Sequence, residues 1–237
     1  MHQLDIVLPC YNPTEDWHIA VVEQFKRLKP HIPDDITIQL FIVNDGSVKN
    51  WNEDKLNYIR HHIPDAHLVS YAINRGKGYA LRYGVAQCNG DYIIYTDIDF
   101  PYTTASMSSV FHALKLGADI VAGNRAKDYY DQMPKTRIYI SKFLKRIIKL
   151  LLGLRFTDTQ CGLKGFNQQG KSLFLSTTIN RYLFDLEFIF QASKREDIKM
   201  IPVAVELRND IVFSRMNLKI LISESLNFIK ILFKRNA

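Results

Sequence analysis

Short apolar runs alternate with amphipathic segments along the first half of the chain. The runs are rich in Val, Ile, Leu and Tyr and have the length of buried strands; they span 4–9, 37–45, 66–73, 91–99 and 118–125. Apolar residues at helical spacing occupy the segments between them, at 16–28, 52–63, 76–88 and 104–117. Strands that alternate with helices of this length predict βαβ units and an α/β fold with a mostly parallel sheet. Such sheets bind their ligands at the carboxyl ends of the strands.

The second half carries two basic amphipathic segments. Residues 137–155 combine apolar positions at helical spacing with six Lys and Arg and no acidic residue. Residues 217–237 have a similar pattern, with Lys and Arg toward their ends. Such helices can lie in the headgroup plane of an anionic membrane, or they can pack on the core with their lysines in solvent. No run of about 18 uninterrupted apolar residues occurs, so we expect no transmembrane helix.

Composition narrows the classes of partner and compartment. The 237 residues carry a net charge of +7 at pH 7, which favours nucleotide phosphates, an acidic membrane surface or nucleic acid as partner. No recognised nucleic-acid-binding motif accompanies the charge, so we expect no nucleic acid partner. Cys10, Cys88 and Cys161 are far apart without a CxxC pair, which excludes a disulfide framework and a zinc site and favours the reducing cytosol. Residues 1–12 read as a first strand and not as a signal peptide.

Carboxylates follow two of the predicted strands. Asp45 ends the run at 37–45, and Asp97 and Asp99 end the run at 91–99. Alternate residues of a strand face the same way, so a continuing strand would place Asp97 and Asp99 together. Two hard oxygen donors suit Mg²⁺ or Mn²⁺, which proteins often hold with one or two carboxylates plus substrate phosphates. The alternative is that these carboxylates cap turns at the start of loops.

Two further stretches carry candidate chemistry. Gly76 and Gly78 flank Lys77 before a predicted helix, either as a phosphate-binding turn at a helix N-terminus or as a turn that needs glycine. Asp185 and Glu187 interrupt a later apolar pattern of helical type. Because a buried acid is costly, we expect these two to line a pocket, with Glu187 on a solvated face as the alternative.

These stretches occur in an order that resembles family 2 inverting glycosyltransferases of the GT-A fold. They are "LPCYN", "VNDGS", "NRGKGYALRYG", "DYIIYTDID", "DTQCGLKGF" and "FDLEF". The resemblance covers about residues 4 to 220, and the last two stretches are most similar to the branch that makes dolichyl- or polyprenyl-phosphate sugars. It implies one glycosyltransferase domain, with a nucleotide-sugar-binding half at 1–130 and an acceptor-binding half with amphipathic, interfacial helices at 131–237. The implied cofactor is Mg²⁺ or Mn²⁺.

The resemblance also implies roles for single residues. It implies nucleotide-sugar contacts at Pro9, Tyr11, Asn12, Asp45, Lys77, Asp97, Ser214 and Arg215. Asp45 would accept a hydrogen bond from the base, and Ser214 and Arg215 would lie in a loop that closes over the nucleotide. Asp99, with Asp97 beside it, would ligate the metal ion, and Arg125 would face the diphosphate or the acceptor phosphate. The implied catalytic residues are Asp97, Asp99, Arg125 and Asp185.

Three positions depart from the family pattern. Pro13 stands in "YNP" where the family has "YNE", so Glu15 is the candidate substitute for the acidic contact. Asn44 replaces the first acid of the usual pair and leaves Asp45 as the second. Pro101 stands where polyprenyl-phosphate mannosyltransferases often have Gln, which weakens the case for a further metal ligand and for GDP-mannose.

The implied reaction moves a glucose or mannose-type hexose from a nucleotide sugar, of UDP-glucose or GDP-mannose type, to a polyprenyl or dolichyl phosphate. This acceptor is already anionic and needs no strong base; Arg125 and Arg181 would hold it. A glycan hydroxyl acceptor would need a carboxylate base, for which Asp185 is the candidate. A third alternative is a catalytically silent nucleotide-sugar-binding partner at a membrane, against which the retained Asp97, Asp99 and Arg125 argue. We expect a cytoplasmic protein, peripheral on the cytosolic membrane face, and leave a homo-oligomer open.

Overall fold

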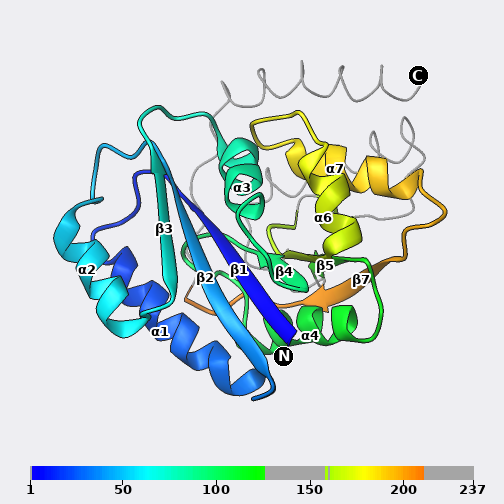
Figure 1. Ribbon diagram of the computed structural model, residues 1–237, viewed down its shortest axis with the longest axis horizontal. Coiled ribbons are helices and arrows are strands. Elements are labelled where there is room, and N and C mark those ends of the chain that lie inside the picture. Colours follow the sequence, from blue (N-terminus) through cyan, green and yellow to red (C-terminus); the bar gives the residue numbers. More distant parts are fainter. Residues whose placement is uncertain (1, 126–157, 160, 211–237) are drawn as a thin grey trace.

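The computed structural model describes residues 2–125, 158–159 and 161–210, shown as coloured ribbon in Figure 1. Both predicted basic helices, at 137–155 and 217–237, lie outside the described residues, as do Ser214 and Arg215. Their predicted roles therefore stay predictions.

A seven-stranded mixed sheet forms the middle layer, with strand order β3-β2-β1-β4-β6-β5-β7. β1 is parallel to β2 and β4, β2 is parallel to β3, and β5 is parallel to β7. Only β6, among the described strands, runs antiparallel to its neighbours β4 and β5. The strands are β1 His2–Cys10, β2 Ile36–Asp45, β3 Ala66–Tyr71, β4 Tyr92–Tyr95, β5 Ile120–Arg125, β6 Lys164–Asn167 and β7 Met200–Val205.

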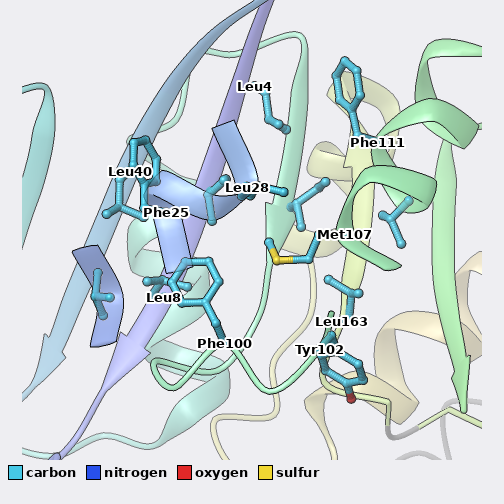
Figure 2. Close-up of a cluster of buried hydrophobic side chains, with 14 of the residues drawn as sticks. Leu4, Leu8, Phe25, Leu28, Leu40, Phe100, Tyr102, Met107, Phe111 and Leu163 are labelled. Carbon is cyan, nitrogen blue, oxygen red and sulfur yellow. The ribbon is translucent and has the colours of Figure 1, made fainter. Parts of the chain in front are cut away.

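Helices cover both faces of the sheet, with α1, α2 and α4 on one side and α3, α6 and α7 on the other (Figure 1). Side chains alternate along β1 accordingly: Leu8 belongs to the first apolar cluster and Val7 to the second. Figure 2 shows Leu8, Phe25 of α1 and Met107 of α4 among the side chains of the first cluster. The helices are α1 Trp17–Leu28, α2 Glu53–His62, α3 Lys77–Val85, α4 Thr104–Lys115, α6 Gln168–Leu175 and α7 Phe184–Ser193, and η1, Lys29–His31, is a short 3₁₀ turn after α1.

Local side chains mark several helix ends. Asn52 caps α2 by accepting a hydrogen bond from the Lys55 N–H, and Thr103 caps α4 by accepting one from the Ser106 N–H. Each such cap contributes about 1 kcal/mol to helix stability. Gly117, with φ +90°, follows the end of α4. These features and the two apolar faces confirm the predicted α/β fold with a mostly parallel sheet.

Two elements differ from the sequence prediction. The strand expected at 91–99 ends at Tyr95, and the Phe100 N–H bonds the Asp97 carbonyl at 3.0 Å. Asp97 and Asp99 therefore belong to a turn. The strand predicted at 91–99 was too long, so the condition for a shared strand face is not met. Phe100, which closes the turn, adopts φ +46° and buries its ring in the first cluster. β6 was not predicted, because its first residue is a lysine, a residue type that is rarely buried in a strand.

Candidate active site

Several predicted residues meet at the edge formed by the carboxyl ends of the parallel strands. β5 runs in the same direction as β4, because β6 is antiparallel to both. Asn12 follows β1 and Asp45 ends β2. Asp97 follows β4 and Arg125 ends β5. The topology therefore brings residues from widely separated parts of the chain to the edge where such sheets bind ligands.

An ion pair joins α3 to the turn after β4. The Lys77 ammonium contacts Asp97 Oδ1, and the two side chains are 22% and 41% exposed. Burial lowers the pKa of Lys77, but the surrounding carboxylates, with Asp97 first, outweigh burial and hold the pKa above its usual value. Asp99 reaches solvent, yet partial desolvation and then the charge of Asp97 raise the pKa of its carboxyl. Asp97 and Asp99 thus repel each other, and a bound cation would relieve that repulsion.

Gly162, from the "DTQCG" stretch, lies directly against Asp97. A Cβ atom on Gly162 would lie 2.9 Å from Asp97 Oδ2, so glycine leaves space for the carboxylate. The hydroxyl of the buried Tyr102 holds this backbone by accepting the Gly162 N–H at 2.9 Å. The Cys161 thiol also donates to that hydroxyl, at 3.3 Å. The backbone of this stretch therefore determines how much space is left beside Asp97, a candidate metal ligand.

Arg125 is held by the carboxylate of Asp158, the first residue of the same stretch. Its Nε and Nη2 donate to the two oxygens of Asp158 at 2.7 and 2.6 Å, and its backbone N–H donates to Asp158 Oδ2 at 3.1 Å. The Asp158 side chain is 1% exposed and that of Arg125 15%. A bidentate pair of this kind fixes the plane of the guanidinium. Asp158 was not among the predicted site residues, although it stands in a quoted motif.

Asp185, the candidate base, belongs to a buried network with Lys164 and Tyr95. Its Oδ1 accepts hydrogen bonds from the Lys164 ammonium at 2.7 Å and from the Tyr95 hydroxyl. The Lys164 side chain is fully buried, and that of Asp185 is 6% exposed. Lys164 Nζ also donates to the Cys161 carbonyl at 2.6 Å. Lys164 was missed by sequence reasoning, although a lone lysine inside the run "GLKGF" is a usable signal for a buried pair.

Glu187 is neither a pocket-lining nor a solvated residue, which corrects both expectations. It is 1% exposed, and its Oε2 accepts the backbone N–H groups of Thr178 and Ile179, each at 2.8 Å. On the other side of this loop, the Arg82 guanidinium donates to the Ile179 carbonyl at 2.8 Å and to Asn180 Oδ1. The loop between α6 and α7 is therefore clamped from two helices. Arg181, predicted to hold the acceptor phosphate, is an exposed residue of this loop.

The glycine turn before α3 accommodates close backbone approach. A Cβ on Gly76 would lie 2.5 Å from the Asn180 carbonyl oxygen, and one on Gly78 would lie 2.7 Å from Phe184 Cβ. The Gly78 and Tyr79 N–H groups donate to the same Asn180 carbonyl at 2.8 and 3.2 Å. The helix N-terminus therefore binds a protein carbonyl, which is the second of the two predicted alternatives for this turn.

Asp45 is saturated with internal hydrogen bonds. Its Oδ1 accepts from the Tyr71 hydroxyl at 2.9 Å and the Arg75 N–H at 2.6 Å. Its Oδ2 accepts from Asn74 Nδ2 at 2.8 Å and the Gly76 N–H at 2.9 Å. A carboxylate offers about four acceptor positions. These contacts assign Asp45 to holding the turn before α3, so its expected contact with the nucleotide base stays a prediction.

The residues after β1 divide into a structural and an exposed group. Asn12, at φ +44°, accepts the Val48 and Lys49 N–H groups at 2.9 and 3.1 Å and so ties the loop after β1 to the loop after β2. Pro9 is half-buried in β1, whereas the Tyr11 side chain is 53% exposed. Tyr11 is therefore available to stack on a ligand, and Asn12 orders the loops around it.

Arg208, which no local pattern indicates, supports the acidic turn from beyond β7. Its Nη1 donates to the carbonyls of Asp99 and Phe100, both at 3.1 Å, and its backbone N–H donates to the Pro101 carbonyl at 2.9 Å. Asp210 in turn accepts from Nε and Nη2 of Arg208 at 2.9 and 2.6 Å. The position of Asp99 therefore depends on a residue more than a hundred positions away in sequence.

The donor set at this edge fits a hard divalent ion. Within residues 2–125, 158–159 and 161–210, no group of three or more His, Cys, Asp and Glu side chains lies in position to hold a metal ion. Asp97 and Asp99 supply two carboxylates in a turn, with space beside Asp97 that a Cβ at Gly162 would fill. Mg²⁺ and its relatives often bind in this way, through one or two carboxylates with water and substrate phosphates completing the shell.

The family model and the relatives that match this chain are all glycosyltransferases. The family model of glycosyl transferase family 2 matches residues 5–172. A dolichyl-phosphate beta-glucosyltransferase of Trichomonas vaginalis is 29% identical over 240 residues, covering 96% of this chain and 72% of that protein. The human dolichyl-phosphate beta-glucosyltransferase is 26% identical over 204 residues, covering 80% of this chain and 63% of that protein.

Solved structures share the fold. Glucosyl-3-phosphoglycerate synthase from Mycobacterium tuberculosis, crystallised with Mn²⁺, UDP and phosphoglyceric acid, superposes with a TM-score of 0.66 at 18% identity, covering 99% of this chain and 78% of that chain. Mannosyl-3-phosphoglycerate synthase from Rubrobacter xylanophilus gives a TM-score of 0.70 at 17% identity, covering 99% and 74%. This likeness confirms the predicted GT-A fold and, at these identities, nothing about substrate.

Proposed function

Because this chain belongs to glycosyl transferase family 2, we propose that it transfers a hexose from a nucleotide sugar to a dolichyl or polyprenyl phosphate. The family and its relatives make the protein a hexosyltransferase. The observation that carries the acceptor is the set of relatives named dolichyl-phosphate beta-glucosyltransferases, which match 80 to 96% of this chain. We propose glucose as the sugar and UDP-glucose as the donor, on the same support.

The residues at the sheet edge support transfer to an anionic acceptor. Asp97 and Asp99 would hold the divalent ion, Mg²⁺ or Mn²⁺, which supplies charge stabilisation for the diphosphate leaving group when bound. Lys77 and Arg125 offer cationic donors to phosphate oxygens of the donor and the acceptor. Asp158 keeps the Arg125 guanidinium in one plane, which limits the loss of freedom when a phosphate binds.

The buried state of Asp185 favours a phosphate acceptor over a glycan hydroxyl. A general base must come within hydrogen-bonding reach of the acceptor's hydroxyl. Asp185 is 4% exposed, and its Oδ1 is already bonded to Lys164 and Tyr95. A lipid phosphate is ionised at neutral pH and attacks without such a base. Two observations disfavour the silent-partner alternative. The chain belongs to a family of transferases, and it keeps both aspartates of the acidic turn.

A lipid acceptor also requires contact with a membrane, and we propose peripheral binding on the cytosolic face. Among the residues that the structure describes, no helix is both long and apolar enough to cross a bilayer. Co-sedimentation with liposomes that contain an anionic lipid tests the proposal. Protein that stays in the supernatant at low salt would contradict it.

A donor and acceptor screen tests the reaction. The protein is incubated with Mn²⁺ or Mg²⁺, a short polyprenyl phosphate, and UDP-glucose, UDP-galactose or GDP-mannose, and sugar-lipid product is measured by mass spectrometry. We expect product with UDP-glucose, and a loss of about 10²–10³ in rate for Asp99→Asn, the typical loss when electrostatic stabilisation is removed. Asp65→Asn, an exposed carboxylate outside the site, is the matched control. Absence of product with every donor would refute the proposed function.

A further inference from the structure

Two carboxylate–ammonium pairs lie at different depths in the candidate site. The outer pair, Lys77 with Asp97, is partly exposed, at 22% and 41% of the two side chains. The inner pair, Lys164 with Asp185, is sealed, at 0% and 6%. The proposed function uses the outer pair directly, whereas the inner lysine has no contact with solvent and therefore cannot touch a substrate.

The first turns of α3 and α7 bring the two pairs together. Gly78 follows Lys77, and a Cβ on Gly78 would lie 2.7 Å from Phe184 Cβ, next to Asp185 in the chain. Tyr95, whose hydroxyl donates to Asp185, stands two residues before Asp97. A cluster of two lysines and the carboxylates of Asp97, Asp99 and Asp185 thus spans the distance from the core to the rim.

Asp185 contacts one lysine and lies near the turn that carries the other. It accepts a hydrogen bond from the Lys164 ammonium at 2.7 Å. Its chain neighbour Phe184 packs against Gly78, the residue after Lys77. A carboxylate this deeply buried needs a cationic partner, because an uncompensated buried charge is strongly destabilising. Without Lys164, Lys77 would be the cation at hand for Asp185.

We propose that Lys164 is a positioning residue, which neutralises Asp185 and so leaves Lys77 paired with Asp97 at the rim, facing the donor diphosphate. This inference rests on the proposed function for the role of Lys77. Lys164 also ties down the Cys161 carbonyl at 2.6 Å, one residue before the glycine that packs on Asp97. The electrostatic and the tethering effects of Lys164 make different predictions, so they can be separated.

The test is a double-mutant cycle on the inner pair, with UDP affinity measured by calorimetry in the presence of Mn²⁺. Lys164→Met leaves Asp185 to draw Lys77 inward, and we expect UDP to bind roughly ten- to a hundredfold more weakly, the scale of one hydrogen bond to a charged group. Lys164→Met with Asp185→Asn removes the carboxylate that competes for Lys77, so affinity should recover most of that loss. A double variant no better than Lys164→Met would overturn the proposal in favour of the tether. The control is Lys171→Met, which removes an ammonium that donates to the Cys88 carbonyl at 2.6 Å.

A second measurement does not depend on nucleotide binding. In protein labelled with ¹⁵N-lysine, the Lys77 ammonium signal, assigned through Lys77→Arg, should move in Lys164→Met and return in the double variant. If Lys164→Met does not fold, Tyr95→Phe removes one donor to Asp185 and should shift the same signal to a smaller extent. An unmoved Lys77 signal would overturn the proposal. If wild-type protein binds no nucleotide, the proposed function fails, and this signal still decides the role of Lys164.

Discussion

Replacing Glu187 tests whether the clamped loop between α6 and α7 supports both stability and the site. In Glu187→Ala, the backbone N–H groups of Thr178 and Ile179 lose the acceptor that each now reaches at 2.8 Å. The buried Ile179 N–H left without an acceptor costs about 1–3 kcal/mol, whereas the partly buried Thr178 N–H can turn to water and costs about 0.5–1.5 kcal/mol. We therefore expect the free energy of unfolding to fall by about 2–4 kcal/mol. Glu187→Gln can keep its amide oxygen at the position of Oε2, so it should cost only about 1–2 kcal/mol, the part that depends on charge.

Urea unfolding followed by circular dichroism measures these losses, with Glu196→Ala as an exposed control. The same loop presents the Asn180 carbonyl to the Gly78 N–H, so a loosened loop should also weaken UDP binding, more in the Ala than in the Gln variant. A loss below about 1 kcal/mol in Glu187→Ala would place it among ordinary surface changes and refute the reasoning. Equal losses in the Ala and Gln variants would show that the backbone contacts carry no weight.

Three further predictions concern the acidic turn and the cysteines. Asp99→Asn should weaken Mn²⁺ binding, measured by electron paramagnetic resonance, while raising the melting temperature of the metal-free protein, because it removes repulsion with Asp97; a lower melting temperature contradicts this. Gly162→Ala should weaken Mn²⁺ binding with little loss of stability, since its Cβ would meet Asp97 Oδ2 at 2.9 Å; unchanged metal affinity argues against it. Its control is Gly165→Ala, whose Cβ would meet core side chains at 2.8 Å; this variant should lose stability and keep its Mn²⁺ affinity. Burial raises the pKa of Cys10 to about 12, so under native conditions at pH 8 roughly one thiol in ten thousand is ionised and alkylation should be negligible until urea is added; rapid native labelling at this site would contradict the burial.

The local pattern was sufficient for most of the fold because its elements are set by periodicity. The apolar run at 37–45 predicted β2, and the amphipathic segment at 16–28 predicted α1, each within one residue of the structure. Placement of Asp45 and Asp97 at the carboxyl edge followed from the βαβ order alone. The extent of β4 could not be predicted, because the turn after it places Phe100 against residues of other elements, and local pattern does not reveal such contacts.

The partners of the charged side chains were beyond the reach of local pattern. Sequence alone shows that Asp185 and Glu187 interrupt an apolar helix, but not which donors they meet. Asp185 meets Lys164 and Tyr95, the latter ninety positions away, and Glu187 meets a loop backbone. The cost of burying a charge predicted that both acids need polar partners, and both have them. For Glu187 these partners are protein groups and not a pocket. Buried ion pairs and backbone caps satisfy the same physical requirement without a ligand.

The glycine turn shows how the same residues can serve recognition indirectly. Glycines before a helix suggested a phosphate at the helix N-terminus, but the Asn180 carbonyl already accepts the N–H groups of Gly78 and Tyr79. Asp45 accepts the N–H groups of Arg75 and Gly76 just before them. With these four N–H groups already bonded, we expect a phosphate beside this turn to be met chiefly by the Lys77 side chain. Lys77 lies between Gly76 and Gly78 in this turn. The glycines therefore contribute to binding by fixing the backbone position from which the Lys77 side chain extends.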